Sequence, residues 1–128
     1  MFRTSPILTN VWIDALSGKL VASAFLKFSV QASWAGYSAI TRLELLGYPG
    51  LTHEEELKIN ELLKAFTEIA VESNIIDKAI FIRKGVRIKV PDAIIAATAL
   101  EKDCSLVTRN VEDFKGIIGL DVIDPHAK

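Results

Sequence analysis

The sequence is poor in cysteine and histidine, which many enzymes use as nucleophiles, bases or metal ligands. Cysteine occurs once, at Cys104, and histidine twice, at His53 and His126. A single cysteine cannot form an internal disulfide, and its neighbours offer no metal-ligand spacing, so we expect a reducing, cytoplasmic environment. Neither histidine lies in a motif that would activate a nucleophile. Any catalytic function must therefore rest on other side chains.

Long apolar runs and an excess of one charge are also absent. The longest nearly uninterrupted apolar run, residues 93–100, is far shorter than the roughly 20 residues that a membrane span needs, and the N-terminus lacks the layout of a secretory signal. A formal net charge of -1 argues against a broad basic surface, but not against a local basic groove. With 128 residues, half of them hydrophobic, the chain predicts one soluble domain over residues 1–128, with no membrane partner.

Short apolar segments alternate with helical patterns along the chain. Helix caps are indicated at Ser38, at Thr52 with Glu55 in a capping box, and at Pro91. Strands are predicted in residues 5–8, 33–39, 66–71, 105–108 and 119–124, and helices in 9–17, 20–31, 38–46, 52–66, 74–85 and 91–102. This alternation predicts an α/β fold in which helices flank a small, mostly parallel sheet on both faces.

Glu44 interrupts an otherwise apolar helix pattern. In "ITRLELLGY" it shares a predicted stripe with Ile40 and Leu43, because residues three and four apart lie on one helix face. The pattern therefore predicts a carboxylate that points inward. Such a group needs a cation, hydrogen bonds or a metal, since burying it alone costs several kcal/mol. An ion pair with Arg42 or Arg3 and a metal-ligand role both remain open.

Asp92 and Asp113 are two further candidate site residues. Asp92 begins a helix whose next eight residues carry no charge, which predicts a buried helix; an acid there would also complement the helix dipole. Asp113 follows the predicted strand 105–108, together with Thr108 and Asn110. Ligand sites in open α/β sheets lie at the carboxyl ends of strands, although ordinary turn chemistry also uses these residues. Taken together, the three acids favour a site for a hard divalent cation.

Four motifs in order then identify a family resemblance. The segments "LTNVWIDAL", "SAITRLELL", "PDAIIAATAL" and "LVTRNVEDF" resemble the PIN-domain family, in particular the toxin subunits of VapBC-type modules. The similarity spans almost the whole chain. It implies a PIN-like three-layer fold, and a metal-dependent endoribonuclease that is the toxin of a type II toxin–antitoxin system. It also implies Mg²⁺ or Mn²⁺ as cofactor, RNA as substrate, a cognate antitoxin and a homodimer.

The resemblance also assigns roles to individual residues. It implies that three acids are the catalytic and metal-ligating groups: Glu44, Asp92 and Asp113. Four polar residues match the family's supporting positions around the pocket: Thr9, Asn10, Thr108 and Asn110. A basic run before Asp92 is a candidate contact for RNA phosphates, although it could equally be a solvated helix end: Arg83, Lys84, Arg87 and Lys89.

The chain departs from the family at Leu8. Family members usually read Asp-Thr-Asn after the first strand, whereas this chain reads Leu8-Thr9-Asn10. Either the first acidic ligand has been substituted, or the end of the strand is shifted in register. We therefore expect a ribonuclease whose activity is impaired by the missing carboxylate. The alternative is a catalytically inactive PIN-like module that binds RNA or an antitoxin.

Overall fold

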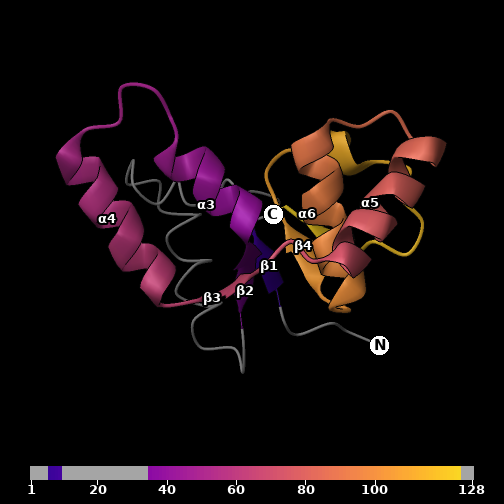
Figure 1. The fold of residues 1–128 in the computed structure, drawn as a ribbon. Helices are drawn as coiled ribbons and strands as arrows, with labels where there is room; N and C mark the ends of the chain where they lie inside the picture. The colour runs from indigo at the N-terminus through magenta and orange to yellow at the C-terminus, as the bar shows by residue number, and fades with distance from the viewer. Residues whose placement is uncertain (1–5, 10–34, 125–128) are drawn as a thin grey trace.

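A computed structural model describes residues 6–9 and 35–124 of the chain (Figure 1). The helices predicted within residues 9–31, and with them Asn10, lie outside the described residues. Among the helices that are described, none is long and apolar enough to cross a membrane.

Five short strands form one parallel sheet. They are β1 (Pro6–Leu8), β2 (Gly36–Ser38), β3 (Thr67–Ile69), β4 (Ser105–Val107) and β5 (Val122–Ile123), in the order β3-β2-β1-β4-β5. Every neighbouring pair is parallel. The predicted parallel sheet is thus confirmed. The chain builds the sheet outward from β1 in one direction and then crosses to β4 on the other side, so the strand order reverses between β1 and β4.

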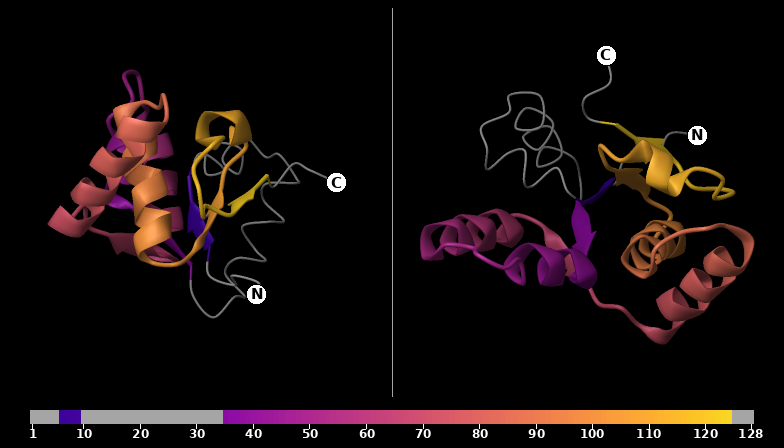
Figure 2. Two further views of the ribbon diagram at one scale, coloured as in Figure 1. Left: turned by 90° about the vertical axis from the view of Figure 1, so that its right-hand side faces the viewer. Right: turned by 90° about the horizontal axis from the view of Figure 1, so that it is seen from above.

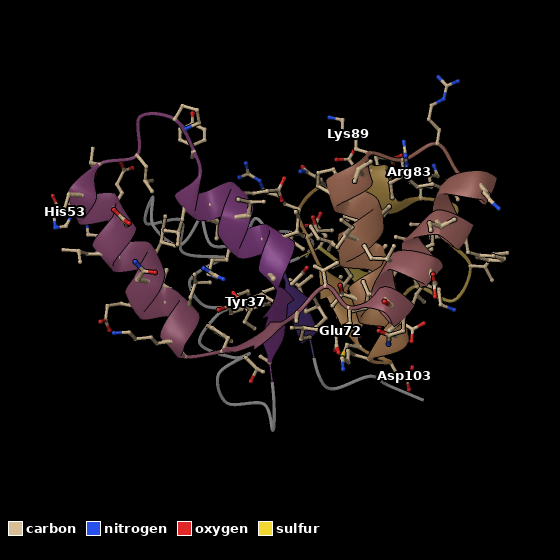
Figure 3. The ribbon with its side chains drawn as sticks, viewed as in Figure 1. Tyr37, His53, Glu72, Arg83, Lys89 and Asp103 are labelled. Carbon is tan, nitrogen blue, oxygen red and sulfur yellow. The ribbon has the colours of Figure 1, made fainter. Side chains whose placement is uncertain are left out.

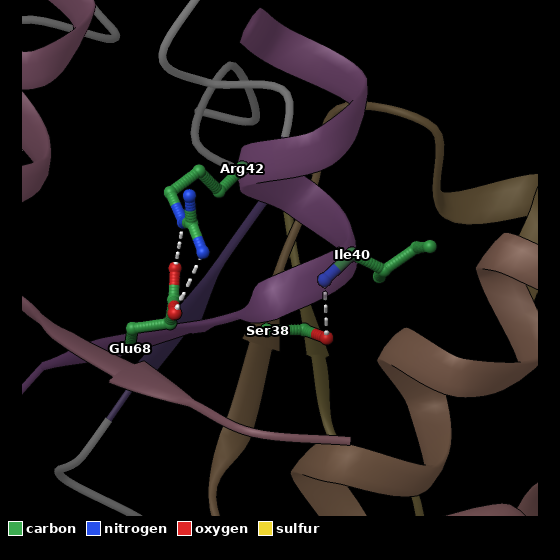
Figure 4. A network of polar contacts seen from close by, with 4 residues as sticks. All are labelled: Ser38, Ile40, Arg42 and Glu68. Atoms are coloured by element: carbon green, nitrogen blue, oxygen red, sulfur yellow. Dashed lines mark hydrogen bonds and ion pairs between the residues drawn. The ribbon is translucent and has the colours of Figure 1, made fainter. Parts of the chain in front are cut away.

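Helices connect these strands and begin where their caps predict. They are α3 (Ala39–Leu46), α4 (His53–Lys64), α5 (Ser73–Gly85), α6 (Val90–Glu101) and the 3₁₀ helix η1 (Val111–Phe114). The Ser38 hydroxyl accepts a hydrogen bond of 3.2 Å from the Ile40 N–H (Figure 4). Thr52 and Glu55 form the reciprocal capping box, and Pro91 lies in the first turn of α6. Because each cap satisfies or avoids an unpaired backbone donor, the local sequence determines these starts.

The sheet has an apolar core on each face. Ile7 and Leu106 pack in a cluster with α5 and α6, whereas Leu8 and Val107 pack in a second cluster with α4. This alternation follows from the two-residue period of a strand. Figure 2 shows α4 on one side of the sheet and α5 and α6 on the other. The prediction of helices on both faces is confirmed.

Helix α6 is the most deeply buried of the described helices. Ala93 and five consecutive residues, Ile95 to Ala99, are buried. The uncharged run therefore packs as predicted, and it fixes the first turn of α6, which carries Asp92, against the carboxyl ends of the strands.

Candidate functional site

A pocket of about 210 Å³ lies beside the carboxyl ends of β1 and β4. Thr9 follows β1 and Thr108 follows β4, and the two strands pair in register with Leu8 opposite Val107. This is the place where the strand order reverses, which is the usual position of a ligand site in an open α/β sheet. The residues that line the pocket are Thr9, Thr41, Glu44, Leu45, Asp92, Ile95, Thr108, Asn110 and Phe114.

Two of the pocket threonines stabilise its base. The Thr9 hydroxyl donates a hydrogen bond of 3.0 Å to the Val107 carbonyl, and so ties β1 to β4. The Thr108 hydroxyl accepts a bond of 3.1 Å from the Asn110 N–H, which shapes the turn after β4. Thr9, Thr108 and Asn110, which the family resemblance assigns to supporting positions, all line the pocket.

Helix α3 brings Glu44 to the pocket in a different way from that predicted. The expected stripe is wrong, because Leu43 is 65% exposed while Thr41 and Leu45 are the buried residues of the helix. Thr41 and Leu45 lie four residues apart and seat α3 against the rest of the domain. Glu44, next to Leu45, is among the exposed residues and lines the pocket. Its carboxylate is thus accessible to a ligand.

Arg42 does not neutralise Glu44. Its guanidinium instead forms an ion pair with Glu68 of β3, with a second bond of 3.3 Å from Nη2 (Figure 4). The proposed pair between Glu44 and Arg42 is therefore wrong. Arg3, the other candidate partner, lies outside the described residues.

Burial and the charge of a nearby acid raise the pKa of both pocket carboxyls, Glu44 and Asp92. The pKa of Glu44 is raised mainly by partial burial and further by the charge of Asp92. Burial also raises the pKa of Asp92, with a smaller contribution from Asp113, while Lys89 lowers it. Negative charge therefore accumulates at the pocket, as expected where a cation binds.

Asp113 occupies a more distant position than the other two predicted acids. It is exposed on η1 and does not line the pocket, although its charge acts on Asp92. Leu8 is also outside the lining. It is fully buried in the apolar cluster that contains Tyr37 and Val107. The residue after β1 that lines the pocket is Thr9.

The donor atoms of the pocket fit a hard divalent cation with few protein ligands. Over residues 6–9 and 35–124, no three or more Asp, Glu, His or Cys side chains form a group that could hold a metal by themselves. Glu44 and Asp92 nevertheless provide two carboxylates, and threonine hydroxyls surround them. Mg²⁺ is commonly held by one or two carboxylates and keeps several waters, so this donor set is sufficient in kind.

Sequence reasoning missed one polar residue of the pocket, Thr41. It is 4% exposed, and its hydroxyl has no hydrogen-bond partner among the residues that the structure describes. Its position three residues before Glu44, on the same helix face, is the signal that could have identified it.

The four basic residues near α6 differ in their surroundings. Lys89 is the N-cap residue of α6, three residues before Asp92, and its charge lowers the pKa of that acid. The Arg83 Nε donates a bond of 3.1 Å to the Ile88 carbonyl, and Figure 3 shows Arg83 and Lys89 at the same end of the helix pair α5 and α6. Lys84 lines a separate cavity between α5 and the loop after η1, whereas Arg87 is exposed between the two helices.

Comparisons with known proteins agree with this geometry. The model of the PIN domain family matches residues 9–117. The chain is 31% identical to a chain of a toxin-antitoxin complex from Klebsiella pneumoniae, with a TM-score of 0.79, covering 97% of this chain and 99% of that one.

Two further solved structures share the fold at lower identity. A chain of VapBC2 from Rickettsia felis, bound to a promoter DNA fragment, is 21% identical, with a TM-score of 0.82 and coverage of 93% and 97%. A chain of FitAcB from Neisseria gonorrhoeae is 24% identical, with a TM-score of 0.79 and coverage of 95% and 99%. No curated protein sequence matches the chain.

Proposed function

Because this chain belongs to the PIN-domain family, we propose that it is a metal-dependent endoribonuclease and the toxin component of a type II toxin–antitoxin system. The family resemblance inferred from the sequence is confirmed. The observation that carries the proposal is the convergence of Glu44 from α3 and Asp92 from α6 on one pocket at the reversal point of the sheet. RNA cleavage that requires both Mn²⁺ and Asp92 is the test.

In the proposed site, Glu44 and Asp92 would hold Mg²⁺ or Mn²⁺, and Asp113 on η1 would add negative charge beside Asp92. The cation, when bound, supplies a water of lowered pKa and neutralises charge on the phosphodiester. The carboxylates of the chain fix its position. The hydrogen bonds of Thr9 and Thr108 hold the strand ends in place, so that the pocket keeps its shape when substrate enters.

The end of β1 supplies no carboxylate to the pocket, which supports a reduced rate. Leu8 contributes no oxygen to the pocket, and Thr9 supplies a hydroxyl that is already bonded to Val107. A cation held by fewer carboxylates is bound more weakly and positioned less firmly, and small misplacements of reacting groups cost orders of magnitude in rate. If the protein shows no metal-dependent cleavage, the alternative is favoured: an inactive module that binds RNA or an antitoxin.

The substrate contact that we propose rests on Lys89 and Arg87. Lys89 lies close enough to Asp92 to lower its pKa, which places positive charge at the rim of an otherwise negative pocket. Arg83 supports the turn through its bond to Ile88, and Lys84 lines another cavity. Phosphate contacts from the first pair would position RNA against the carboxylates.

We also propose that the chain binds a cognate antitoxin in the cytoplasm, as the similarity to a chain of the Klebsiella pneumoniae toxin-antitoxin complex supports. The lone cysteine, Cys104, is buried as a thiol rather than in a disulfide, which is compatible with a reducing compartment.

A homodimer is the third partner that we propose, through the outer face of α5. Ile76, Ile80 and Phe81 are 39%, 49% and 76% exposed on this face. Asp77 and Lys84 lie on either side of these residues, at equal distances along the sequence from the midpoint between Ile80 and Phe81. Neither side chain forms an ion pair among the described residues. A twofold axis through that midpoint pairs two α5 helices antiparallel. It then sets Asp77 against the partner subunit's Lys84, so the face is self-complementary.

A further inference from the structure

The hydroxyl of Thr41 is a buried polar group without a hydrogen bond. Thr41 is 4% exposed in α3, and over residues 6–9 and 35–124 its Oγ1 is the one buried side-chain oxygen or nitrogen that lacks a partner. A buried hydroxyl in this state has lost its water without compensation, and such groups are rare in folded proteins. An unsatisfied group of this kind therefore calls for a bound species that the fold alone does not provide.

Three other buried threonines have hydroxyls that form hydrogen bonds within the fold. Thr98 of α6 is fully buried, and its Oγ1 donates a bond of 2.7 Å to the Ile94 carbonyl one turn earlier. The hydroxyls of Thr9 and Thr108 are bonded at 3.0 and 3.1 Å within the pocket itself. Thr41 alone among these four keeps its hydroxyl uncommitted, on the wall that also carries Glu44.

The pocket around Thr41 limits what the hydroxyl can bind. Glu44 and Asp92 surround it with negative charge, so an anion that is not accompanied by a cation would be repelled. The apolar side chains of Leu45, Ile95 and Phe114 offer no hydrogen-bond partner. A cation that keeps part of its hydration shell supplies water protons for a neutral oxygen, and it is attracted by both acids.

We propose that Thr41 is a positioning residue of the cation site, whose hydroxyl accepts a hydrogen bond from a water on the cation held by Glu44 and Asp92. This inference rests on the metal site of the proposed function and adds a residue to it. In this arrangement Thr41 orients the hydration shell, as outer-sphere partners do in other metal sites, where their loss costs about 10- to 100-fold in metal affinity.

Two measurements on the full chain test the inference without any nuclease assay. Thr41→Val keeps the shape of the side chain and removes the hydroxyl, and Thr41→Ser retains the hydroxyl. We expect Thr41→Val to raise the melting temperature of the protein in EDTA by several degrees, because an unsatisfied group is removed, and to weaken Mn²⁺ binding in calorimetry by about 10- to 100-fold. Thr41→Ser should bind Mn²⁺ as the wild type does.

Thr98→Val is the matched control, because it removes the hydroxyl of a buried helical threonine that is already bonded. It should lower the melting temperature and leave Mn²⁺ affinity unchanged. Equal Mn²⁺ affinity of Thr41→Val and the wild type would overturn this inference while the metal site stands. A wild type that binds no Mn²⁺ would overturn both the inference and the metal dependence of the proposed function.

Discussion

Leu8 of β1 lies opposite Val107 of β4 in the sheet register, and both side chains are fully buried in the same apolar cluster. Position 8 is therefore a core position on the α4 face, and the next residue, Thr9, is the one that lines the pocket. Leu8 thus stabilises the fold beneath the pocket. This relationship decides which substitutions can restore a carboxylate to the pocket.

Leu8→Asp should destabilise the protein rather than repair the site. The new carboxylate would lie among apolar side chains without a cation, which costs several kcal/mol, so the urea midpoint should fall sharply. Leu8→Ile, which preserves volume, should cost less than about 1.5 kcal/mol. A stably folded Leu8→Asp protein with stronger Mn²⁺ binding would show that position 8 faces the pocket after all.

Thr9→Asp should strengthen metal binding. The substitution adds a third carboxylate beside Glu44 and Asp92, at the cost of the hydrogen bond to Val107, which contributes about 1 kcal/mol. We expect higher Mn²⁺ affinity in calorimetry and lower stability in EDTA. Thr9→Asn loses the same hydroxyl without adding charge, so equal Mn²⁺ affinities for the two variants would refute the prediction.

Asp92→Asn should stabilise the metal-free protein at neutral pH. The pKa of Asp92 is raised in the folded protein by burial and by Asp113, so ionisation of Asp92 opposes folding. The gain should be at most about 1 kcal/mol, because a half-exposed charge interacts weakly with its surroundings. It should be present above the raised pKa and vanish as the pH falls below the ordinary range of an aspartate, where the carboxyl is protonated in both states. Urea unfolding of both proteins in EDTA, from pH 7 to pH 3, measures this difference; a gain that persists at low pH would rule out charge as its cause.

The local sequence predicts much of this fold because the relevant interactions span only a few residues. The Ser38 cap and the capping box of Thr52 and Glu55 each join residues two or three apart, and both form as expected. The buried run of α6 is likewise evident from its lack of charge. The positions of Thr108 and Asn110 at the pocket follow from the rule that sites lie at the carboxyl ends of parallel strands.

The features that sequence reasoning missed depend on contacts between distant segments. Helix α3 has only eight residues, so neighbouring elements rather than its own pattern determine which face is buried, and Thr41 is buried where Leu43 was expected. Arg42 of α3 pairs with Glu68, which lies 26 residues away on β3. No local pattern indicates either choice. The displacement of Asp113 from the pocket similarly depends on how η1 packs.

Charge reversal on α5 tests the proposed homodimer. Asp77→Lys alone and Lys84→Asp alone should each weaken the dimer, because each sets like charges against one another across the twofold axis. The double variant should restore it, since each lysine then faces an aspartate again. Light scattering coupled to size exclusion at low salt gives the mass. Single variants that remain dimeric, or a monomeric wild type, would exclude this interface.

The most direct test of the central claim is cleavage of a mixed RNA pool in Mn²⁺ by the wild type, Glu44→Gln and Asp92→Asn, with EDTA as the metal control. Glu112→Gln, which removes an exposed acid of η1 outside the pocket, is the matched variant. The account predicts cleavage by the wild type and Glu112→Gln that is lost in EDTA and in both pocket variants. Cleavage that survives in Asp92→Asn, or a folded wild type that cleaves nothing in Mn²⁺, would contradict it.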